Sequence, residues 1–328
     1  MNDRSTVLQQ LIEQFERGER RALARLLSLV ENEHPVGLSA MAALYRRTGH
    51  AEVVGVTGPP GAGKSTLTNA LIRAWRTRGR SVGVLAVDPS SSLTGGATLG
   101  DRIRMLENWA DDRVYIRSMA TRGQMGGLST AVGASIHLLD AFGFDTVCVE
   151  TVGVGQDEVD IAEVADTVLL LQVPGLGDSI QTIKAGILEI ADILVVNKAD
   201  AAGAAEVVRD LRNMLRLGEQ RAWVPPIVET VATEFTGIDN LVSQIERHQA
   251  FLSASGEGAA RLARRLRAEV ARLARRQLTA HIDAVIASNA VDETLIQLET
   301  REIDPLSAAR IVARIAADRL SESASVAG

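Results

Sequence analysis

The segment GPPGAGKST, residues 58–66, directly follows the apolar run VVGVT. It matches the pattern G-x-x-x-x-G-K-[ST], and the segment LTNALIRAW after it has the period of an amphipathic helix. Glycines allow backbone amides to curl around phosphate oxygens, while the following helix directs its positive end at them. The sequence therefore predicts a strand, a phosphate-binding loop and a helix, rather than a glycine-rich turn without a ligand.

Two side chains of this loop carry specific expectations. Lys64 is expected to reach the β- and γ-phosphates of a nucleotide, and Ser65 to place its hydroxyl on Mg²⁺. The remaining contacts to the nucleotide are expected from the other members of the loop, which are Gly58, Pro59, Pro60, Gly61, Ala62, Gly63 and Thr66.

Short apolar runs alternate with amphipathic stretches from residue 53 to about residue 250. Such alternation predicts an α/β fold of the P-loop NTPase type, with a mostly parallel sheet covered by helices on both faces. Aromatic residues are only 3% of the chain, so aliphatic side chains must fill its core. The predicted strands are Val53–Thr57, Val82–Asp88, Asp145–Glu150, Thr167–Val173, Ile193–Asn197 and Pro226–Val231.

Helical periodicity precedes and follows this region, over residues 5–48 and 259–320. The small, flexible stretch Ser253–Gly258 is typical of a linker. The sequence therefore predicts an N-terminal helical segment over residues 1–50, a P-loop domain over 51–252 and a C-terminal helical arm over 253–328.

Composition argues against several classes of protein. A net charge of −6 disfavours attraction of the whole chain to nucleic acid, and the arginines near residues 261–276 lack interleaved aromatics, which favours a solvated helix face. Cys148 is the only cysteine and lies in an apolar run, which indicates a buried small residue in a reducing compartment. No apolar run approaches the roughly 18 residues of a membrane span, and the N-terminus has no signal pattern, so we expect a cytoplasmic protein.

The run ILVVNKAD predicts which base the site accepts. It places Asn197, Lys198 and Asp200 just after the carboxyl end of a strand, where open α/β sheets bind ligands. A carboxylate at Asp200 can accept hydrogen bonds from N1–H and the exocyclic amine of guanine, whereas adenine would leave it unsatisfied. By themselves these residues could equally cap the next helix, but with the phosphate loop they predict GTP. A second base-contacting loop is expected at Val231, Ala232 and Thr233, although it departs from the usual Ser-Ala pair.

The stretch VCVETVGVGQDE, residues 147–158, ends an apolar strand on an acid. Glu150 and Gly153 have the D-x-x-G spacing of GTPases, with Glu in place of Asp. Glu150 can therefore bind Mg²⁺ directly or through water, and the Gly153 amide can contact the γ-phosphate. Gln156 lies near this loop but is not assigned as the residue that orients water.

Two further loops carry polar side chains that suit a nucleotide switch. Asp88 and Asp101 flank a serine- and glycine-rich loop and could both approach the metal, although Asp88 could also form an Asp-Pro turn. The loop VPGLGDSIQTIKAG carries Gln181 and Lys184, which could respond to the nucleotide or contact a partner.

With these motifs in order, the chain resembles the MeaB-type GTPases, relatives of the human MMAA protein that were long labelled ArgK. The residues that carry the resemblance span most of 53–200: GPPGAGKST, DPSSS, GGATLGDR, SMATRGQMGGLS, ETVGVGQ, GLGDSIQTIKAG and NKAD. The resemblance implies a SIMIBI-class P-loop fold and a homodimer held by the C-terminal arm. It also implies a GTPase chaperone of an adenosylcobalamin-dependent acyl-CoA mutase, usually methylmalonyl-CoA mutase, with Asp88, Asp101 and Glu150 around Mg²⁺ and Gln181 and Lys184 in a third switch.

Three other functions stay open from the sequence. A metallochaperone GTPase for another enzyme would need a metal-binding cluster, yet Cys148 stands alone and only five His are present. A kinase linked to transport would need no guanine discrimination, so the NKAD run counts against it. A nucleic-acid binder would use the basic C-terminal arm and would bind in a salt-dependent way.

We expect slow GTP hydrolysis that is accelerated by the partner.

Overall fold

The computed structural model describes residues 2–88, 111–120, 130–151, 157–175, 185–218 and 221–326. Contacts divide the chain into two compact units, Met1–Arg265 and Leu266–Gly328, and each is described by itself. Within the described residues, no helix is long and apolar enough to span a membrane.

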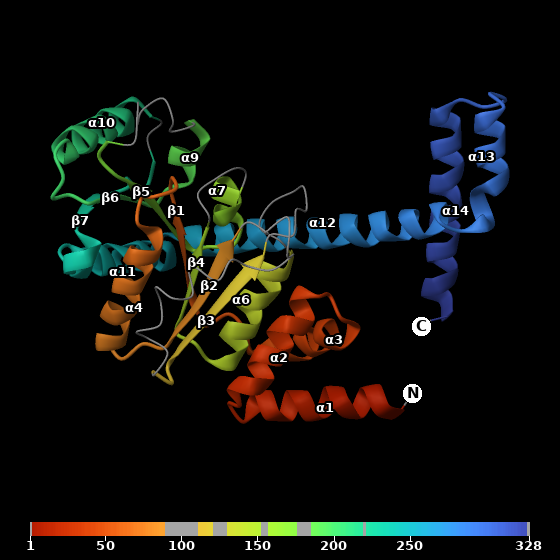
Figure 1. Ribbon diagram of the computed structural model, residues 1–328, viewed down its shortest axis with the longest axis horizontal. Coiled ribbons are helices and arrows are strands. Elements are labelled where there is room, and N and C mark those ends of the chain that lie inside the picture. Colours follow the sequence, from red (N-terminus) through yellow and green to blue (C-terminus); the bar gives the residue numbers. More distant parts are fainter. Residues whose placement is uncertain are drawn as a thin grey trace. The chain divides into compact units, whose positions relative to one another are not determined.

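A seven-stranded sheet forms the centre of the first unit (Figure 1). Its order is β3-β2-β4-β1-β5-β6-β7, and every pair of neighbours runs parallel. The parallel sheet predicted from the apolar runs is therefore confirmed. The strands are β1 Glu52–Thr57, β2 Val82–Asp88, β3 Val114–Ala120, β4 Thr146–Glu150, β5 Thr167–Gln172, β6 Ile193–Asn197 and β7 Ile227–Thr230.

The edge strand β3 is not among the strands predicted above. Its sequence VYIRSMA interrupts the apolar run with Arg117 and Ser118, so it lacks the continuous hydrophobicity of a buried parallel strand. Arg117 is accommodated because its Nη2 donates to Glu31 Oε2 at 2.5 Å and to Ser28 Oγ at 3.2 Å. Arg20 Nη2 also donates to the carbonyl of Val114 at 2.6 Å. The N-terminal helix Arg20–Glu31 thus supplies hydrogen-bond partners to the edge strand.

Helices cover both faces of the sheet because successive strand residues point to opposite sides. On β5, Leu169 and Leu171 belong to the core beneath α4 and α11, whereas Leu170 belongs to the core beneath α9 and α10. Figure 1 shows α4 and α11 on one side of the sheet and α6 on the other. The covering helices are α4 Lys64–Thr77, α6 Thr130–Phe142, α7 Asp157–Asp160, α9 Ala185–Ile190, α10 Ala204–Leu217 and α11 Ile238–Ser255, with short 3₁₀ turns η3 Ile161–Glu163 and η4 Ala232–Glu234.

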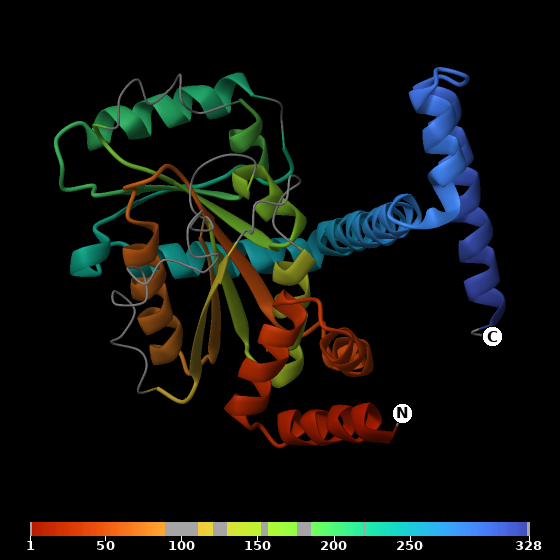
Figure 2. The ribbon, with the colours of Figure 1, turned by 45° about the vertical axis from the view of Figure 1, so that its right-hand side comes forward.

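Three N-terminal helices pack onto α6 rather than forming a separate body, as Figure 2 shows for α2. They are α1 Asn2–Glu16, α2 Arg20–Glu31 and α3 Pro35–Leu44, followed by the 3₁₀ turn η1 Tyr45–Arg47. Leu23, Leu26, Leu27 and Val30 form the buried stripe of α2, as their spacing predicts. The predicted helical N-terminus is confirmed.

The expected linker at Ser253–Gly258 is wrong in extent. Helix α11 continues through Ser255, and only Gly256, with φ +76°, separates it from α12 Glu257–Ile286. The first turns of α12 are fixed to the sheet, since the Arg261 guanidinium donates to both carboxylate oxygens of Asp192 at 2.9 and 3.1 Å. A charged contact thus holds the start of α12 in place, so the small residues before it need not form a flexible linker.

The second unit contains the rest of α12 and three further elements, η5 Asn289–Val291, α13 Asp292–Glu299 and α14 Pro305–Val326. Its buried core is small, with Val285, Val291 and Ala316 at the centre. Apolar side chains elsewhere in this unit face solvent, including Val270 at 64% and Leu306 at 62% exposure. The predicted division of the chain at residues 50 and 252 stays a prediction.

Candidate nucleotide-binding site

The phosphate loop joins the end of β1 to the first turn of α4, which begins at Lys64. Gly58 and Gly63 have positive φ, +140° and +86°. A Cβ at Gly58 would lie 2.5 Å from the carbonyl oxygen of Leu171 on β5. A Cβ at Gly63 would lie 2.6 Å from Asn197 Nδ2. Only glycine fits both places, so the loop can close tightly against the ends of β5 and β6.

The amino group of Lys64 lies inside this loop. Lys64 is 7% exposed, and its Nζ donates to the carbonyls of Gly58 at 2.8 Å and Pro59 at 3.0 Å. Gly63 precedes the helix without a side-chain cap, so the first amides of α4 are not capped by that residue. A buried cation beside uncapped helix amides is the arrangement that binds phosphate oxygens.

Glu150 and Ser65 meet at the tip of β4. The parallel register places Glu150 opposite Val56 of β1, and Ser65 Oγ donates to Glu150 Oε1 at 2.5 Å. Thr151 holds this tip in place, because its N donates to Val56 O at 3.0 Å and its Oγ1 to Thr57 Oγ1 at 3.0 Å. Glu150 is 7% exposed. A hydroxyl and a carboxylate within contact of each other form an oxygen donor set that fits Mg²⁺.

Asn197 joins the phosphate loop to the predicted base site. It is 2% exposed and ends β6. Its Nδ2 donates to Ala62 O of the phosphate loop at 2.9 Å. Its Oδ1 accepts from Thr230 Oγ1 at 3.2 Å and from the backbone N of Ala232 at 3.3 Å. One buried amide therefore ties together three segments that are far apart in the sequence.

Lys198 and Asp200, which follow Asn197 in the NKAD run, have different surroundings. Lys198, with φ +55°, donates from Nζ to Gly61 O at 3.0 Å, which adds a second link to the phosphate loop. Asp200 is exposed just after β6 and is free of the burial that a structural carboxylate would show. Its position beyond the strand end suits contact with a base, as the sequence predicts.

The second predicted base loop follows β7. Val231 and Thr236 form an antiparallel bridge, with backbone N–H···O distances of 3.1 and 3.3 Å, which closes the loop between them. Ala232 and Thr233 lie in the 3₁₀ turn η4 inside this closed loop. The structure thus brings this loop to Asn197 through the backbone N of Ala232, which donates to Asn197 Oδ1.

Other predicted site residues fall partly or wholly outside the described part of the chain. Asp88 ends β2, where its backbone pairs with Ala120, and its side chain is not described. The residues that lie outside the described ranges are Asp101, Gly153, Gln156, Gln181 and Lys184. Their roles around Mg²⁺, phosphate or a partner stay predictions.

Cys148 shows why burial excludes a chemical role. It is fully buried on β4, and burial, reinforced by the negative charge of Glu150, raises the pKa of its thiol far above the usual range. The interpretation of Cys148 as a buried small residue is confirmed. Among the described residues, no group of three or more His, Cys, Asp or Glu side chains is placed to hold a metal ion.

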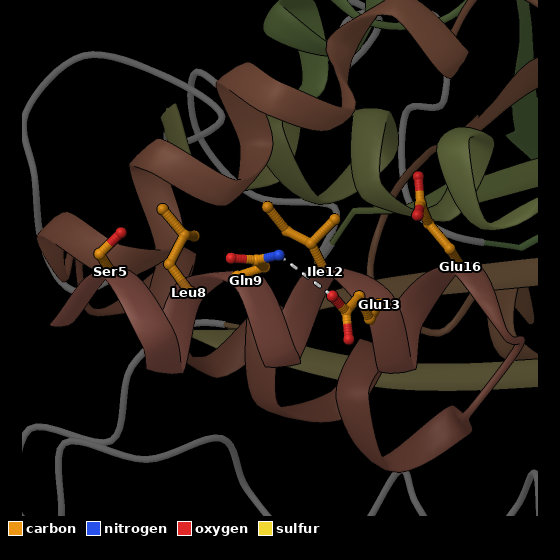
Figure 3. A pocket seen from close by; sticks show the side chains of 6 residues that line it. All are labelled: Ser5, Leu8, Gln9, Ile12, Glu13 and Glu16. Carbon is orange, nitrogen blue, oxygen red and sulfur yellow. Dashed lines mark hydrogen bonds between the residues drawn. The ribbon is translucent and has the colours of Figure 1, made fainter. Parts of the chain in front are cut away.

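An open hollow of about 370 Å³ lies away from these residues, along one face of α1 (Figure 3). Its wall carries apolar and acidic side chains, and Gln9 Nε2 donates to Glu13 Oε1 at 3.3 Å one turn further along α1. The lining residues are Ser5, Leu8, Gln9, Ile12, Glu13 and Glu16. None belongs to the predicted nucleotide site.

The strand, glycine-rich loop and helix at one end of a parallel sheet define a P-loop NTPase fold. Comparison with known proteins agrees with this class. A solved structure described as an LAO/AO transport system kinase superposes with a TM-score of 0.67 and 28% identity, over 94% of this chain and 97% of that one.

The family follows from sequence. A family model described as methylmalonyl Co-A mutase-associated GTPase MeaB matches residues 23–287, and the chain belongs to this family. A protein of Pyrococcus abyssi named as a GTPase is 47% identical over 310 residues, or 93% of this chain and 96% of the relative. The mouse protein named methylmalonic aciduria type A homolog, mitochondrial, is 36% identical over 264 residues, or 75% of this chain and 64% of the relative. The resemblance inferred from the motifs is confirmed, and the chain is a member of a GTPase family.

Proposed function

We propose that this chain is a GTP-hydrolysing chaperone that gates adenosylcobalamin loading, and protection or reactivation, of methylmalonyl-CoA mutase or a related acyl-CoA mutase. The observation that carries the nucleotide part is the contact of Asn197 with both Ala62 and Ala232. It joins the phosphate loop to the NKAD run and the second base loop in one site. The partner part is supported by the family description, methylmalonyl Co-A mutase-associated GTPase.

The nucleotide occupies this site through groups of three kinds. The phosphate loop, residues 58–66, and the first amides of α4 hold the phosphates, with Lys64 turning from the carbonyls of Gly58 and Pro59 to the β- and γ-phosphates. The Asp200 carboxylate accepts hydrogen bonds from N1–H and the exocyclic amine of guanine. The loop from Val231 to Thr233 forms the other side of the base site.

Ser65 and Glu150 would hold Mg²⁺, since their oxygens already lie 2.5 Å apart. When bound, Mg²⁺ neutralises charge that develops on the phosphate oxygens. Asp88 and Asp101 are proposed to complete the metal surroundings, and the Gly153 amide to contact the γ-phosphate.

Hydrolysis of GTP to GDP and phosphate is proposed to proceed by positioning and charge neutralisation, without a covalent enzyme intermediate. Lys64 neutralises charge on the β–γ bridge, and Asn197 keeps the loop in register with the base site. We propose slow intrinsic turnover that increases when the mutase orders the switch segments, including Gln181 and Lys184.

The second unit supports a homodimer as the functional form. Its small buried core and the exposed Val270, Ile296 and Leu306, at 58–64% exposure, leave apolar area that a second copy can cover. The site of action is proposed to be the cytoplasm.

The test compares GTP hydrolysis by the purified chain alone and with each adenosylcobalamin-dependent acyl-CoA mutase of its source organism. Binding is measured in parallel with GDP and with a non-hydrolysable GTP analogue. We expect nucleotide-dependent binding to one mutase and a higher hydrolysis rate in its presence, and the Lys64→Ala variant controls for contaminating hydrolysis. Absence of binding to every mutase under both nucleotides would refute the partner part, and equal use of ATP would refute the guanine part.

A transport-linked kinase is kept as a second candidate because the solved structure quoted above carries that description. The proposed contact of Asp200 with guanine does not favour it. Radiolabelled γ-phosphate distinguishes the two, since a GTPase releases all of it as inorganic phosphate and a kinase transfers it to an acceptor. The metallochaperone alternative predicts stoichiometric nickel or zinc on the purified protein.

A further inference from the structure

The backbone of Phe235 is in an unusual conformation. Its φ is +57°, in the left-handed region that glycine and asparagine adopt readily but large side chains seldom do. Phe235 also leaves 41% of its surface exposed, so burial in the core does not explain its position. Strain in such a place is maintained by surrounding contacts, and it often accompanies a functional loop.

One of these contacts is made by Arg73, on the exposed face of α4. The Arg73 guanidinium lies over the Phe235 ring, 4.1 Å from its centroid, within the range of a cation–π interaction. Helix α4 is the same helix that begins at Lys64 of the phosphate loop. The contact therefore fixes the second base loop to the element that carries the phosphate site.

The loop that contains Phe235 is held at three places. The bridge between Val231 and Thr236 closes it, and the backbone N of Ala232 donates to Asn197 Oδ1 at 3.3 Å on its inner side. The stack of Arg73 on Phe235 holds its outer side. Gly237 comes directly after this loop, and only glycine fits there because a Cβ would lie 2.2 Å from Glu229 O. A loop fixed on both sides presents its backbone groups in one arrangement.

We propose that Arg73 and Phe235 are a positioning pair that fixes the loop Val231–Thr236 beside the purine and sets discrimination at its 6-position. The inference rests on the proposed guanine nucleotide. The 6-carbonyl of guanine accepts hydrogen bonds from backbone N–H groups, whereas the 6-amine of adenine donates and is rejected by them. Asp200 reads the other edge of the base, so the two sides of the site distinguish different parts of the purine.

The test measures affinities for GDP, IDP and ADP. GDP and IDP share the 6-carbonyl, whereas IDP lacks only the exocyclic amine that Asp200 is proposed to bind. In Arg73→Ala and Phe235→Gly, we expect the preference for GDP over ADP to fall two- to fivefold, the equivalent of about 0.5–1 kcal/mol. The preference for GDP over IDP should stay within experimental error. Asp200→Ala should lose the preference for GDP over IDP, and also part of the preference for GDP over ADP, because its carboxylate is proposed to accept hydrogen bonds from N1–H as well as from the exocyclic amine.

Two further variants separate positioning from general stability. Phe235→Trp keeps an aromatic face for Arg73 and should retain the preference for GDP over ADP. Arg78→Ala removes an arginine at the end of the same helix, which pairs with Asp239 at 3.1 Å and not with the loop, and should change neither preference. Phe235→Gly removes the ring without requiring a strained backbone, so it remains informative if another variant unfolds.

The outcomes are distinct. If wild-type protein shows no preference for GDP over ADP, the proposed function fails and the inference fails with it. If wild type prefers GDP but Phe235→Gly and Arg73→Ala keep that preference unchanged, only the positioning inference is overturned. A parallel loss of both preferences would also overturn it, since the pair would then support the whole base site rather than the 6-position.

Discussion

Replacement of Asn197 by alanine is the most informative single perturbation of this site. The Asn197 amide makes three hydrogen bonds, to Ala62 O, Thr230 Oγ1 and the backbone N of Ala232. Each is worth about 1 kcal/mol net, so Asn197→Ala should lower the free energy of unfolding of the sheet unit by about 3 kcal/mol. The loss per bond should lie at the upper end of the usual range for a hydrogen bond, because Thr230 is fully buried and Ala232 is 5% exposed. Their polar groups would be left without a partner and away from water.

The same variant should weaken GDP binding by at least about tenfold, because the phosphate loop and the base loop lose their common partner. Urea denaturation followed by circular dichroism, with and without GDP, measures the stability, and calorimetric titration measures the affinity. Thr230→Val is the matched control, since it removes only one of the three hydrogen bonds and should cost about 1 kcal/mol. If Asn197→Ala loses no more stability than Thr230→Val, Asn197 does not link the two loops.

Three further predictions concern the same unit. Gly63→Ala should abolish nucleotide binding in equilibrium dialysis, because its Cβ would lie 2.6 Å from Asn197 Nδ2; unchanged affinity would contradict the close packing of the loop. Glu150→Gln keeps an acceptor for the Ser65 hydroxyl but loses the charge, so the Mg²⁺ concentration needed to slow GDP release should rise at least about tenfold, with little change in stability. Asp192→Ala should cost about 3–5 kcal/mol at neutral pH in thermal or urea unfolding. Burial raises the pKa of the Asp192 carboxyl, but hydrogen bonds from His248 and Arg261 outweigh it and hold the pKa below its usual range. A folded-state pKa below the unfolded value near 3.9 means that the contribution is complete above about pH 4 and is lost below it, so the difference between wild type and Asp192→Ala should narrow only in acid.

The sequence could predict the parts of the site that depend on short, local patterns of residues. The glycines and Lys64 of the phosphate loop occupy fixed spacings, and Glu150 and Asn197 each end an apolar run that is long enough to be recognised as a buried strand. Parallel strands place their carboxyl ends at one edge of the sheet, so these residues could be expected to meet there without knowledge of the strand order.

The two features that the sequence did not predict correctly, strand β3 and the helical start of α12, have a common physical cause. Strand β3 carries Arg117, whose partner Glu31 is on an N-terminal helix. Its sequence therefore lacks the continuous apolar run that is typical of a buried strand. The small residues after Ser253 look like a linker, yet the contact of Arg261 with Asp192 helps to fix the start of α12 on the sheet. In both places a charged contact between distant segments overrides the local signal.

Local sequence patterns were sufficient to predict the class of fold, the phosphate loop and the acid at the tip of β4, because backbone conformation and strand hydrophobicity depend on neighbours along the chain. Long-range packing set the strand order β3-β2-β4-β1-β5-β6-β7, the role of Asn197 as a link between two loops, and the stacking of Arg73 on Phe235. Those contacts join residues that are distant in sequence, and a hydrogen bond or a ring contact across such a distance has no period or spacing from which it could be predicted.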